Sequence, residues 1–318
     1  MEAPQFLKRL LGLKDPRRAA SLVAKGVSQA RGGDLKGALA SYRAALAADD
    51  EYALAHLNVA LCLQDLYNVD RTTLAGEEQD ERLHQLAGHL RRAVELDARL
   101  TPGFRALGFV ERALGDFEAA RDAFNRYLAA AEEKDPHRER VLQTLTEVQD
   151  KAVIQEHLRV GLDVAERAAE ADEPTRADAE TRLTYVAEKE PQRAQALWAL
   201  GVLRRTAKDL EAATRWLDAA LVADPGCLPA HKELASLHFH GGNPALALPH
   251  ARACYEADPT NPALTCNLGV CHLALGNLAE ARELVDLARD MAPKDPIVQD
   301  AFRAVEEATR DAAGAVKK

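Results

Sequence analysis

Histidine and cysteine side chains, which can bind metal ions or act as bases and nucleophiles, gather in one stretch of the 318-residue sequence. Five of the ten histidines and four of the five cysteines lie between residues 227 and 272. This cluster admits a metal-binding or enzymatic module at 231–272. The spacing argues against it, because His238 and His240 are two residues apart and point to different faces of a helix, unlike the i, i+4 pair of a zinc site. We therefore expect packed core histidines, with no metal and no cofactor.

The usual catalytic motifs are missing from the sequence. Its four serines lie outside any GxSxG motif, and no P-loop, HExxH or strand-following GxGxxG occurs. Carboxylate pairs such as Glu132-Glu133 and Glu306-Glu307 are adjacent, so they do not face each other on a helix. We expect no catalytic residues and a protein that is not an enzyme.

Composition excludes several other classes of protein. The formal net charge of −9 disfavours nucleic-acid binding, which needs a basic face. Apolar residues at 47% argue against disorder, and aromatic residues at 5% argue against a β-sandwich. The longest uncharged run, 259–279, contains prolines and asparagines, so we expect no transmembrane segment. Five cysteines without a CxxC pair fit a reducing compartment, and we expect a cytoplasmic protein.

The N-terminal segment, 1–18, is basic and amphipathic. Lys8, Arg9 and Lys14 contribute to its charge, and Phe6 and several leucines give it an apolar face. Such a segment could make weak contact with a membrane surface through residues 5–13. We expect it instead to pack onto the first structural unit of the chain.

A period of 34 residues runs through the second half of the chain. Prolines keep this step at Pro191, Pro225, Pro259 and Pro293. Three more series keep it as well: Leu200, Leu234 and Leu268; Gly201, Ala235 and Gly269; and Ala213, Ala247 and Ala281. The period predicts a helix–turn–helix unit that is repeated.

Each repeated residue type has a physical role in such a unit. A small residue such as Gly201 lets two helices approach closely where they cross. Gly242 and Gly276 are expected to adopt left-handed backbone at the turn, and Asn243 and Asn277 to cap the next helix. The prolines end the second helix of one unit and start the following unit.

This pattern resembles the tetratricopeptide repeat. The best copy is 194–227, which carries Leu197, Leu200-Gly201, Ala213, Leu217, Ala220 and Asp224-Pro225, and units at 19–52, 101–136, 228–261 and 262–295 follow the same template. The resemblance implies an all-α, right-handed α-solenoid of about seven helix–turn–helix units. Helical patterns between Pro136 and Pro174 and after Pro296 add a long central helix and a C-terminal capping helix.

We divide the chain into two arrays. Residues 19–150 are expected to form three units with an insertion near 68–81, residues 151–311 four units plus the capping helix, and residues 312–318 a flexible tail. A single kinked superhelix is the alternative. The insertion is interpreted as a lengthened second helix and loop, or else as a projecting partner-binding element. In the degenerate fourth unit, Arg167 is expected at the small-residue position.

In the family, the first helix of each unit lines a concave groove. Carrying these positions over gives the groove residues Arg105, Phe109, Arg112, Trp198, Val202, Arg205, Lys232, Ser236, Phe239, His240, Cys266, Val270 and Leu273. The resemblance implies a non-catalytic adaptor that binds a protein or peptide partner. Arg205 and Lys232 beside Trp198 and Phe239 favour acidic and apolar groups in that partner. The alternative is a structural subunit of a larger bacterial motility, secretion or envelope assembly, which docks through the insertion, edges and convex face.

Overall fold

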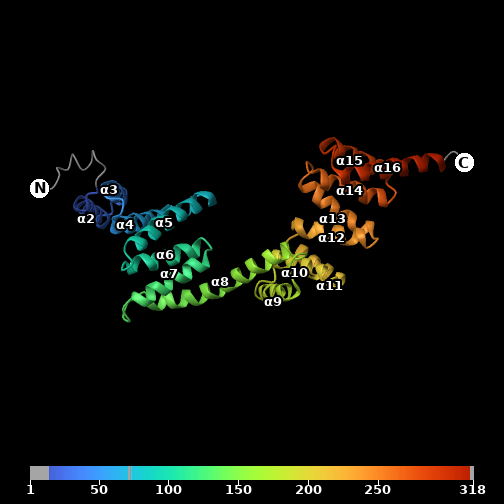
Figure 1. The fold of residues 1–318 in the computed structure, drawn as a ribbon. Helices are drawn as coiled ribbons and strands as arrows, with labels where there is room; N and C mark the ends of the chain where they lie inside the picture. The colour runs from blue at the N-terminus through green and yellow to red at the C-terminus, as the bar shows by residue number, and fades with distance from the viewer. Residues whose placement is uncertain (1–13, 71, 73, 316–318) are drawn as a thin grey trace. The chain divides into compact units, whose positions relative to one another are not determined.

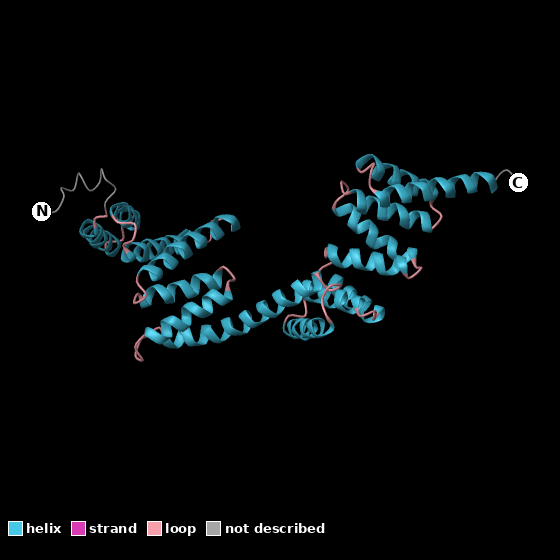
Figure 2. Cartoon of the chain, viewed as in Figure 1, coloured by secondary structure: helices cyan, strands magenta, loops and turns pink. Residues whose placement is uncertain are grey.

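The computed structural model describes residues 14–70, 72 and 74–315, which fold as helices joined by loops (Figure 1, Figure 2). The segment predicted to contact a membrane surface, 5–13, lies outside the described residues. The chain forms two compact units, one ending at Gln155 and the other beginning at Glu156. The prediction of an all-α repeat protein is confirmed.

The first unit contains three helix pairs and the first half of a longer helix. Its helices are α2 (Pro16–Arg31), α3 (Leu35–Ala48), α4 (Ala53–Asp70), α5 (Gly76–Leu96), α6 (Thr101–Ala113), α7 (Phe117–Ala130) and α8 (Arg138–Glu166), which continues into the second unit. From α2 to α7, each helix packs against the next one, and α2 also packs against α4. Val141 and Leu145 of α8 complete a core that contains Phe104, Phe124 and Tyr127. This nearest-neighbour packing is typical of a repeat array.

The second unit continues from the other half of α8. Its further helices are α9 (Glu173–Lys189), α10 (Ala194–Thr206), α11 (Leu210–Ala223), α12 (Leu228–His240), α13 (Pro244–Ala257), α14 (Pro262–Ala274), α15 (Leu278–Met291) and α16 (Pro296–Ala315). Pro225, Pro259 and Pro293 all lie in the short connections that come after a pair. The last helix, α16, packs on both α14 and α15, as a terminal cap should.

Close helix crossings depend on small residues, as predicted. A Cβ atom added at Gly201 would lie 2.6 Å from Cγ of Leu217, and one added at Gly269 would lie 2.8 Å from Cγ2 of Val285. Ala235 and Ala251 hold the corresponding places on α12 and α13. A larger side chain at Gly201 would force apart a crossing whose atoms already touch.

In the fourth pair, the small residue is Gly161 and the prediction of Arg167 was wrong. A Cβ atom added at Gly161 would lie 2.4 Å from Cγ of Leu183 on α9, whereas Arg167 lies past the end of α8. Leu183 follows Gly161 by 22 residues, but Leu217 follows Gly201 by only 16. A longer connection between α8 and α9 therefore shifts the register, and counting residues back from later units misplaces the crossing.

The turns inside the pairs use left-handed backbone at one residue. Gly242 and Gly276 have φ of 75° and 79°, as expected, and in the α10–α11 turn the place is taken by Lys208 with φ of 64°. Asn243 and Asn277 do stand at the N-cap positions, but neither side chain makes a capping hydrogen bond. Capping side chains are found instead at aspartates of other pairs, where Asp34, Asp116 and Asp209 accept from backbone N–H groups.

The insertion lengthens both helices of the second pair. Helix α4 has 18 residues and α5 has 21, compared with 13 and 14 in α6 and α7. Two contacts join the extended ends: Arg82 forms an ion pair of 3.2 Å with Asp70, and the Tyr67 hydroxyl lies 3.5 Å from the Gln79 side-chain oxygen. Both helices of the pair are thus extended, so the prediction of a lengthened second helix and loop described only part of the change.

At the C-terminus, α16 continues to Ala315, so the predicted flexible tail from 312 is helical through that residue. Alanines at this end favour the extension.

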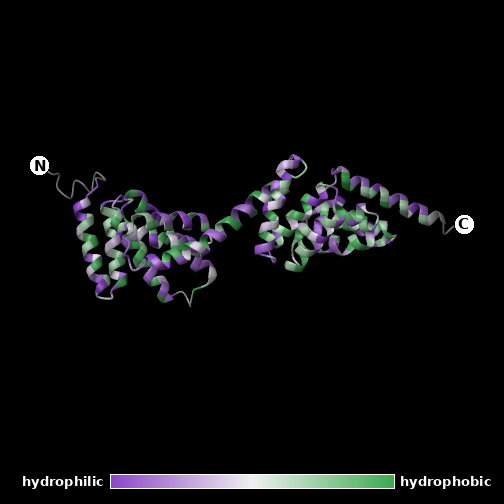
Figure 3. Cartoon of the chain, turned by 90° about the horizontal axis from the view of Figure 1, so that it is seen from below, coloured by the Kyte–Doolittle hydropathy of each residue, from purple (hydrophilic) through white to green (hydrophobic). Residues whose placement is uncertain are grey.

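Hydrophobic and hydrophilic residues alternate around the helices (Figure 3). Among the described residues, no helix combines the length and the apolar character needed to cross a membrane.

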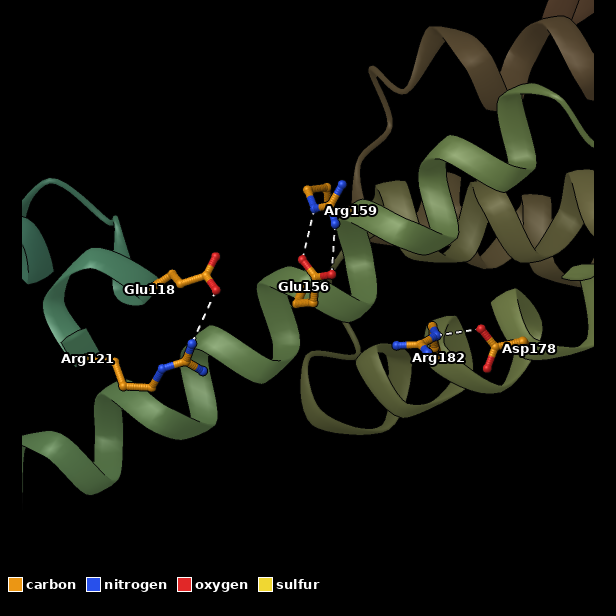
Figure 4. A network of polar contacts seen from close by, with 6 residues as sticks. All are labelled: Glu118, Arg121, Glu156, Arg159, Asp178 and Arg182. Atoms are coloured by element: carbon orange, nitrogen blue, oxygen red, sulfur yellow. Dashed lines mark hydrogen bonds and ion pairs between the residues drawn. The ribbon is translucent and has the colours of Figure 1, made fainter. Parts of the chain in front are cut away.

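Ion pairs within single helices recur along the surface. On α8, the Glu156 carboxylate accepts from Arg159 at 2.9 Å, and on α9 Asp178 pairs with Arg182 at 2.7 Å (Figure 4). The hydrogen bond from Arg159 holds the pKa of Glu156 below its usual value. Such pairs each stabilise a helix by about 0.3–0.5 kcal/mol.

Candidate functional site

An open pocket of about 500 Å³ lies in the second unit among α12, α13, α14 and the start of α16. Its wall is mainly apolar, with Phe239 from α12, Leu264 and Val270 from α14, and Ile297 from α16. Ile297 is 70% exposed, so an apolar group in the pocket would cover it. The pocket can therefore hold an apolar side chain of a ligand.

Polar groups stand among these apolar residues. They are the ammonium group of Lys232, the hydroxyl of Ser236, the imidazole of His240 and the amides of Asn261 and Asn267. Lys232 is exposed and forms no ion pair within the described part of the chain. The pocket thus combines an apolar wall with one cation and several hydrogen-bonding groups.

Five of the predicted groove residues come together here. Lys232, Ser236, Phe239 and His240 lie on α12, and Val270 lies on α14. His240 is oriented by its own helix, since its Nδ1 lies 2.8 Å from the backbone oxygen of Ser236. Leu273 is packed beside the core formed by α14, α15 and α16.

Two predicted groove residues are buried, and their assignment to an accessible surface was wrong. Cys266 is 0% exposed because α16 covers it, through Val298 and Val305 in the same core. Val202 is 4% exposed, on a helix with neighbours on several sides, α9, α11 and α12. Neither side chain can reach a ligand in the groove.

Arg205 is paired with a carboxylate of the protein, and Trp198 packs beside its core. Nε of Arg205 lies 2.7 Å from the Glu233 carboxylate on α12, so its charge joins neighbouring units. Trp198 is half-buried beside the core of α10, α11 and α12, and its buried indole N–H has no hydrogen-bond partner among the described residues. Neither residue lines the pocket.

The remaining predicted groove residues, Arg105, Phe109 and Arg112, belong to α6 in the first unit. Phe109 packs edge-on against Phe124 with ring centroids 5.0 Å apart, and the Arg140 guanidinium lies 5.1 Å from its ring centroid. Its ring is therefore used in packing. Arg112 is exposed and Arg105 half-buried.

Sequence reasoning missed several pocket residues, notably Asn261, Asn267, Cys254 and Ile297. Asn261 caps α14, and its side chain accepts from the backbone N–H of Ala263 at 3.1 Å. Cys254 lies on α13 and Ile297 on α16. Neither is the first helix of a repeat unit, and only first helices were expected to line the groove. Only Asn267 was next to a predicted groove residue, Cys266, and the structure shows that its side chain is exposed.

The thiols at the pocket are poor nucleophiles. Cys254 and Cys271 are each 3% exposed, and burial raises the pKa of both thiols, so they stay protonated at neutral pH. All five cysteines of the chain are buried and unpaired. The pocket is therefore suited to packing and hydrogen bonding.

The clustered histidines do not form one site. His231 faces His250, with their Nδ1 atoms 2.9 Å apart, while His272 is buried and lies 3.3 Å from the Asn277 amide. His238 stacks on His250. In the described ranges, no three histidine, cysteine or carboxylate side chains are placed to hold a metal ion together.

Comparisons with known proteins agree with this architecture. Two family models, both described as tetratricopeptide repeat, match the chain, one at residues 238–304 and the other at 3–64 and 176–226. No curated protein matches the sequence significantly.

Among solved structures, MamA from strain AMB-1 is 19% identical over 52% of this chain and 94% of its own, with a TM-score of 0.44. YrrB, described as a TPR protein with an unusual peptide-binding site, is 16% identical over 82% of this chain and 97% of its own, with a TM-score of 0.32. A tetratricopeptide repeat protein from Parabacteroides merdae is 15% identical over 91% and 99%, with a TM-score of 0.35.

Proposed function

Because the chain belongs to the tetratricopeptide repeat family, we propose that it is a non-catalytic scaffold that holds a segment of a partner protein in the α12–α14 pocket. The bound segment carries an apolar side chain and, close to it, a carboxylate. The carboxylate belongs to an acidic side chain or to the C-terminus of the segment.

The make-up of the pocket carries this proposal. An apolar side chain on Phe239, Val270 and Ile297 would remove their surface from water at about 25 cal/mol per Å². The Lys232 ammonium and the Asn267 amide then stand where they can meet a carboxylate. Since Arg205 is paired with Glu233, Lys232 is the cation that would select the charge of the partner.

The absence of catalysis is part of the same proposal. Both thiols that line the pocket are buried and protonated, and His240 is held by its own helix. A scaffold needs only complementary shape and charge, which these residues can supply without reacting.

Selection of random peptides with free C-termini, displayed on phage, tests the proposal. We expect the selected peptides to share an apolar residue within a few positions of a carboxylate. Their affinity, measured by calorimetry, should fall roughly tenfold or more for Lys232→Glu, since a charge-assisted hydrogen bond contributes about 1.5–3 kcal/mol. Ser236→Trp, which fills the pocket from an exposed position, should abolish binding.

A matched control is available on α13. Arg252→Glu makes the same change of charge at an exposed residue that does not line the pocket, and should leave the affinity unchanged. Circular dichroism establishes that each variant is folded. If no peptide is enriched, or if Ser236→Trp binds as tightly as the unchanged protein, the pocket is not the binding site.

The α4–α5 hairpin favours a second function, a structural subunit that docks into a larger assembly. Arg82 and Asp70 join the extended ends of the two helices, and Val69 near the end of α4 is 71% exposed. Replacing residues 66–82 with Leu-Gly-Asn, the turn found at 275–277, would restore a unit of ordinary length. If that variant folds and still enters the same complexes in cells, the hairpin is not the docking element.

A further inference from the structure

Two histidine pairs occupy the same place in two different helix pairs. His56 and His231 are each the fourth residue of their helices, α4 and α12, and they face His89 on α5 and His250 on α13. In the α10–α11 pair, the positions that correspond to His231 and His250 are occupied by Leu197 and Trp216. An apolar pair therefore suffices for packing at this place, and the histidines add a property of their own.

The backbone fixes which nitrogen carries the proton in each first histidine. Nε2 of His56 lies 3.0 Å from the Asp50 carbonyl oxygen, and Nε2 of His231 lies 3.1 Å from that of Pro225. A carbonyl oxygen only accepts, so Nε2 donates in both rings and Nδ1 of each neutral ring is an acceptor. The partner histidines, His89 and His250, must then donate from their own Nδ1 atoms.

The rings face each other head-on. In the first pair the Nδ1 atoms are 3.0 Å apart and the ring centroids 5.3 Å, and in the second the values are 2.9 Å and 5.2 Å. The difference of 2.3 Å in both pairs is the sum of two ring radii, so each nitrogen lies on the line between the centroids. That is the geometry of an N–H···N hydrogen bond. By contrast, two nitrogen atoms that bind the same tetrahedral zinc ion would lie about 3.3 Å apart, and their lone pairs would both point toward the metal.

We propose that each pair is a proton-dependent fastener between the two helices of its unit. A first proton, added at the free Nε2 of His89 or His250, leaves the Nδ1–H···Nδ1 bond in place and gives it a charged donor. A second proton must go to Nδ1 of His56 or His231, where two N–H groups would then face each other at hydrogen-bond distance. The fastener therefore opens when both rings are charged.

Burial and the groups on neighbouring helices disfavour the first of these two protons. His89 is faced by His56 and by Arg43 of α3, and burial followed by these two groups lowers the pKa of His89 below its usual value. His250 is faced by His231 and His238, while Asp218 of α11 acts in the opposite direction, and the net effect again lowers its pKa, chiefly through burial. Folded pKa values below the unfolded value mean that the unfolded chain binds more protons. The stabilisation is therefore complete above about pH 6.5, decreases as the first proton is taken up at lower pH, and ends when the second proton breaks the hydrogen bond.

The second pair lies beside the proposed binding pocket. It joins α12, which carries Lys232 and Phe239, to α13, which carries Ala251 and Cys254. Opening the pair would loosen the wall between these helices. This consequence for ligand release rests on the proposed function, whereas the fastener itself does not.

Nuclear magnetic resonance of protein with ¹⁵N-labelled histidine tests the hydrogen bond directly. We expect a ¹⁵N–¹⁵N coupling between the Nδ1 atoms of His56 and His89, and another between those of His231 and His250, at about pH 7.5. Both couplings should vanish as the pH is lowered to about 5. Missing couplings at neutral pH, or couplings that persist after all four rings are protonated, would overturn the proposal. Binding of one zinc ion per pair by the metal-free protein would overturn it too, in favour of a metal site.

Hydrogen exchange locates the loosening. After correction for the intrinsic rate, protection of α12 and α13 should fall about tenfold or more between pH 7.5 and 5, while α10 and α11 change little. The double variant His231→Leu/His250→Trp installs the α10–α11 pair and should remove the difference. An equal fall in all four helices, or an unchanged fall in the double variant, contradicts the fastener and leaves the peptide-binding test unaffected.

Discussion

Arg91 on α5 holds Glu111 on α6 through two hydrogen bonds of 2.8 Å, one from Nε and one from Nη2. The Glu111 side chain is 1% exposed and that of Arg91 is 48% exposed. The guanidinium thus neutralises a buried carboxylate where the second helix pair meets the third. Bidentate pairing of this kind fixes the orientation of both side chains.

Replacement of Arg91 by alanine should destabilise the first unit by about 3 kcal/mol, because it leaves a buried charge without its partner. The adjacent Arg92 gives a matched control, since it pairs with Glu95 on the exposed face of the same helix at 3.4 Å. Arg92→Ala should cost no more than about 0.5 kcal/mol. Urea unfolding of both variants measures the difference, and equal losses would contradict the role assigned to Glu111.

Replacement of Lys208 by glycine should stabilise the second unit. A left-handed residue with a side chain costs about 1–2 kcal/mol, and the greater freedom of glycine in the unfolded chain offsets about 0.5–1 kcal/mol of that. We expect a net gain of up to about 1 kcal/mol in the free energy of unfolding. The reciprocal change, Gly242→Lys, should lower it, and a loss of stability in Lys208→Gly would show that the Lys208 side chain has a role of its own.

Gly201 and Leu217 should show strongly non-additive substitutions. Gly201→Ala places a methyl group against Leu217 and should cost about 1–3 kcal/mol, and Leu217→Ala alone should cost about 2–5 kcal/mol through the cavity that it leaves. The double variant recreates the Ala235–Ala251 crossing of the next pair, so its loss should be smaller than the sum by about 0.5–3 kcal/mol. A thermodynamic cycle from urea unfolding measures this coupling, and strict additivity would mean that the two residues do not share the crossing.

The buried thiols should resist alkylation in the folded protein. Burial raises the pKa of Cys254, Cys266 and Cys271, so little thiolate is present at about pH 8. Mass spectrometry after iodoacetamide treatment should find these three unmodified in the native state and all five cysteines modified in denaturant. Rapid native labelling of Cys266, which is 0% exposed, would show that α16 opens from α14.

The repeat could be predicted from the sequence because its signals are local. A proline that cannot continue a helix and a glycine in left-handed backbone each act within one turn, so Pro225, Gly242 and Pro259 suffice to place α12 and α13. The prediction for the fourth pair, α8 and α9, was wrong because its signal is not local. Contact between Gly161 and Leu183 depends on the length of a connection with no repeat signal, and nothing local distinguishes Gly161 from other helical glycines.

The candidate site could be predicted only in part. Equivalent positions carry Lys232, which is exposed, and Cys266, which is covered by α16, because exposure depends on which helix packs next to the unit in space. The same holds for Arg205. Its residue type indicates a free cation, but in the structure it forms an ion pair with Glu233 on α12, the first helix of the next pair. Position in the repeat gives the face of a helix, whereas the neighbours decide which side chains remain available to a ligand.

The division of α8 between the two units determines how the two units could be expressed as separate fragments. Val141, Leu145 and Val148 complete the core of the first unit, while Gly161 and Leu158 belong to the second. A cut before Val148 would take core residues from the first unit, a cut after Leu158 would take them from the second, and a cut between them would leave each unit with a severed helix end. Independent expression of the halves therefore calls for overlapping fragments, with α8 encoded at the end of one and again at the start of the other.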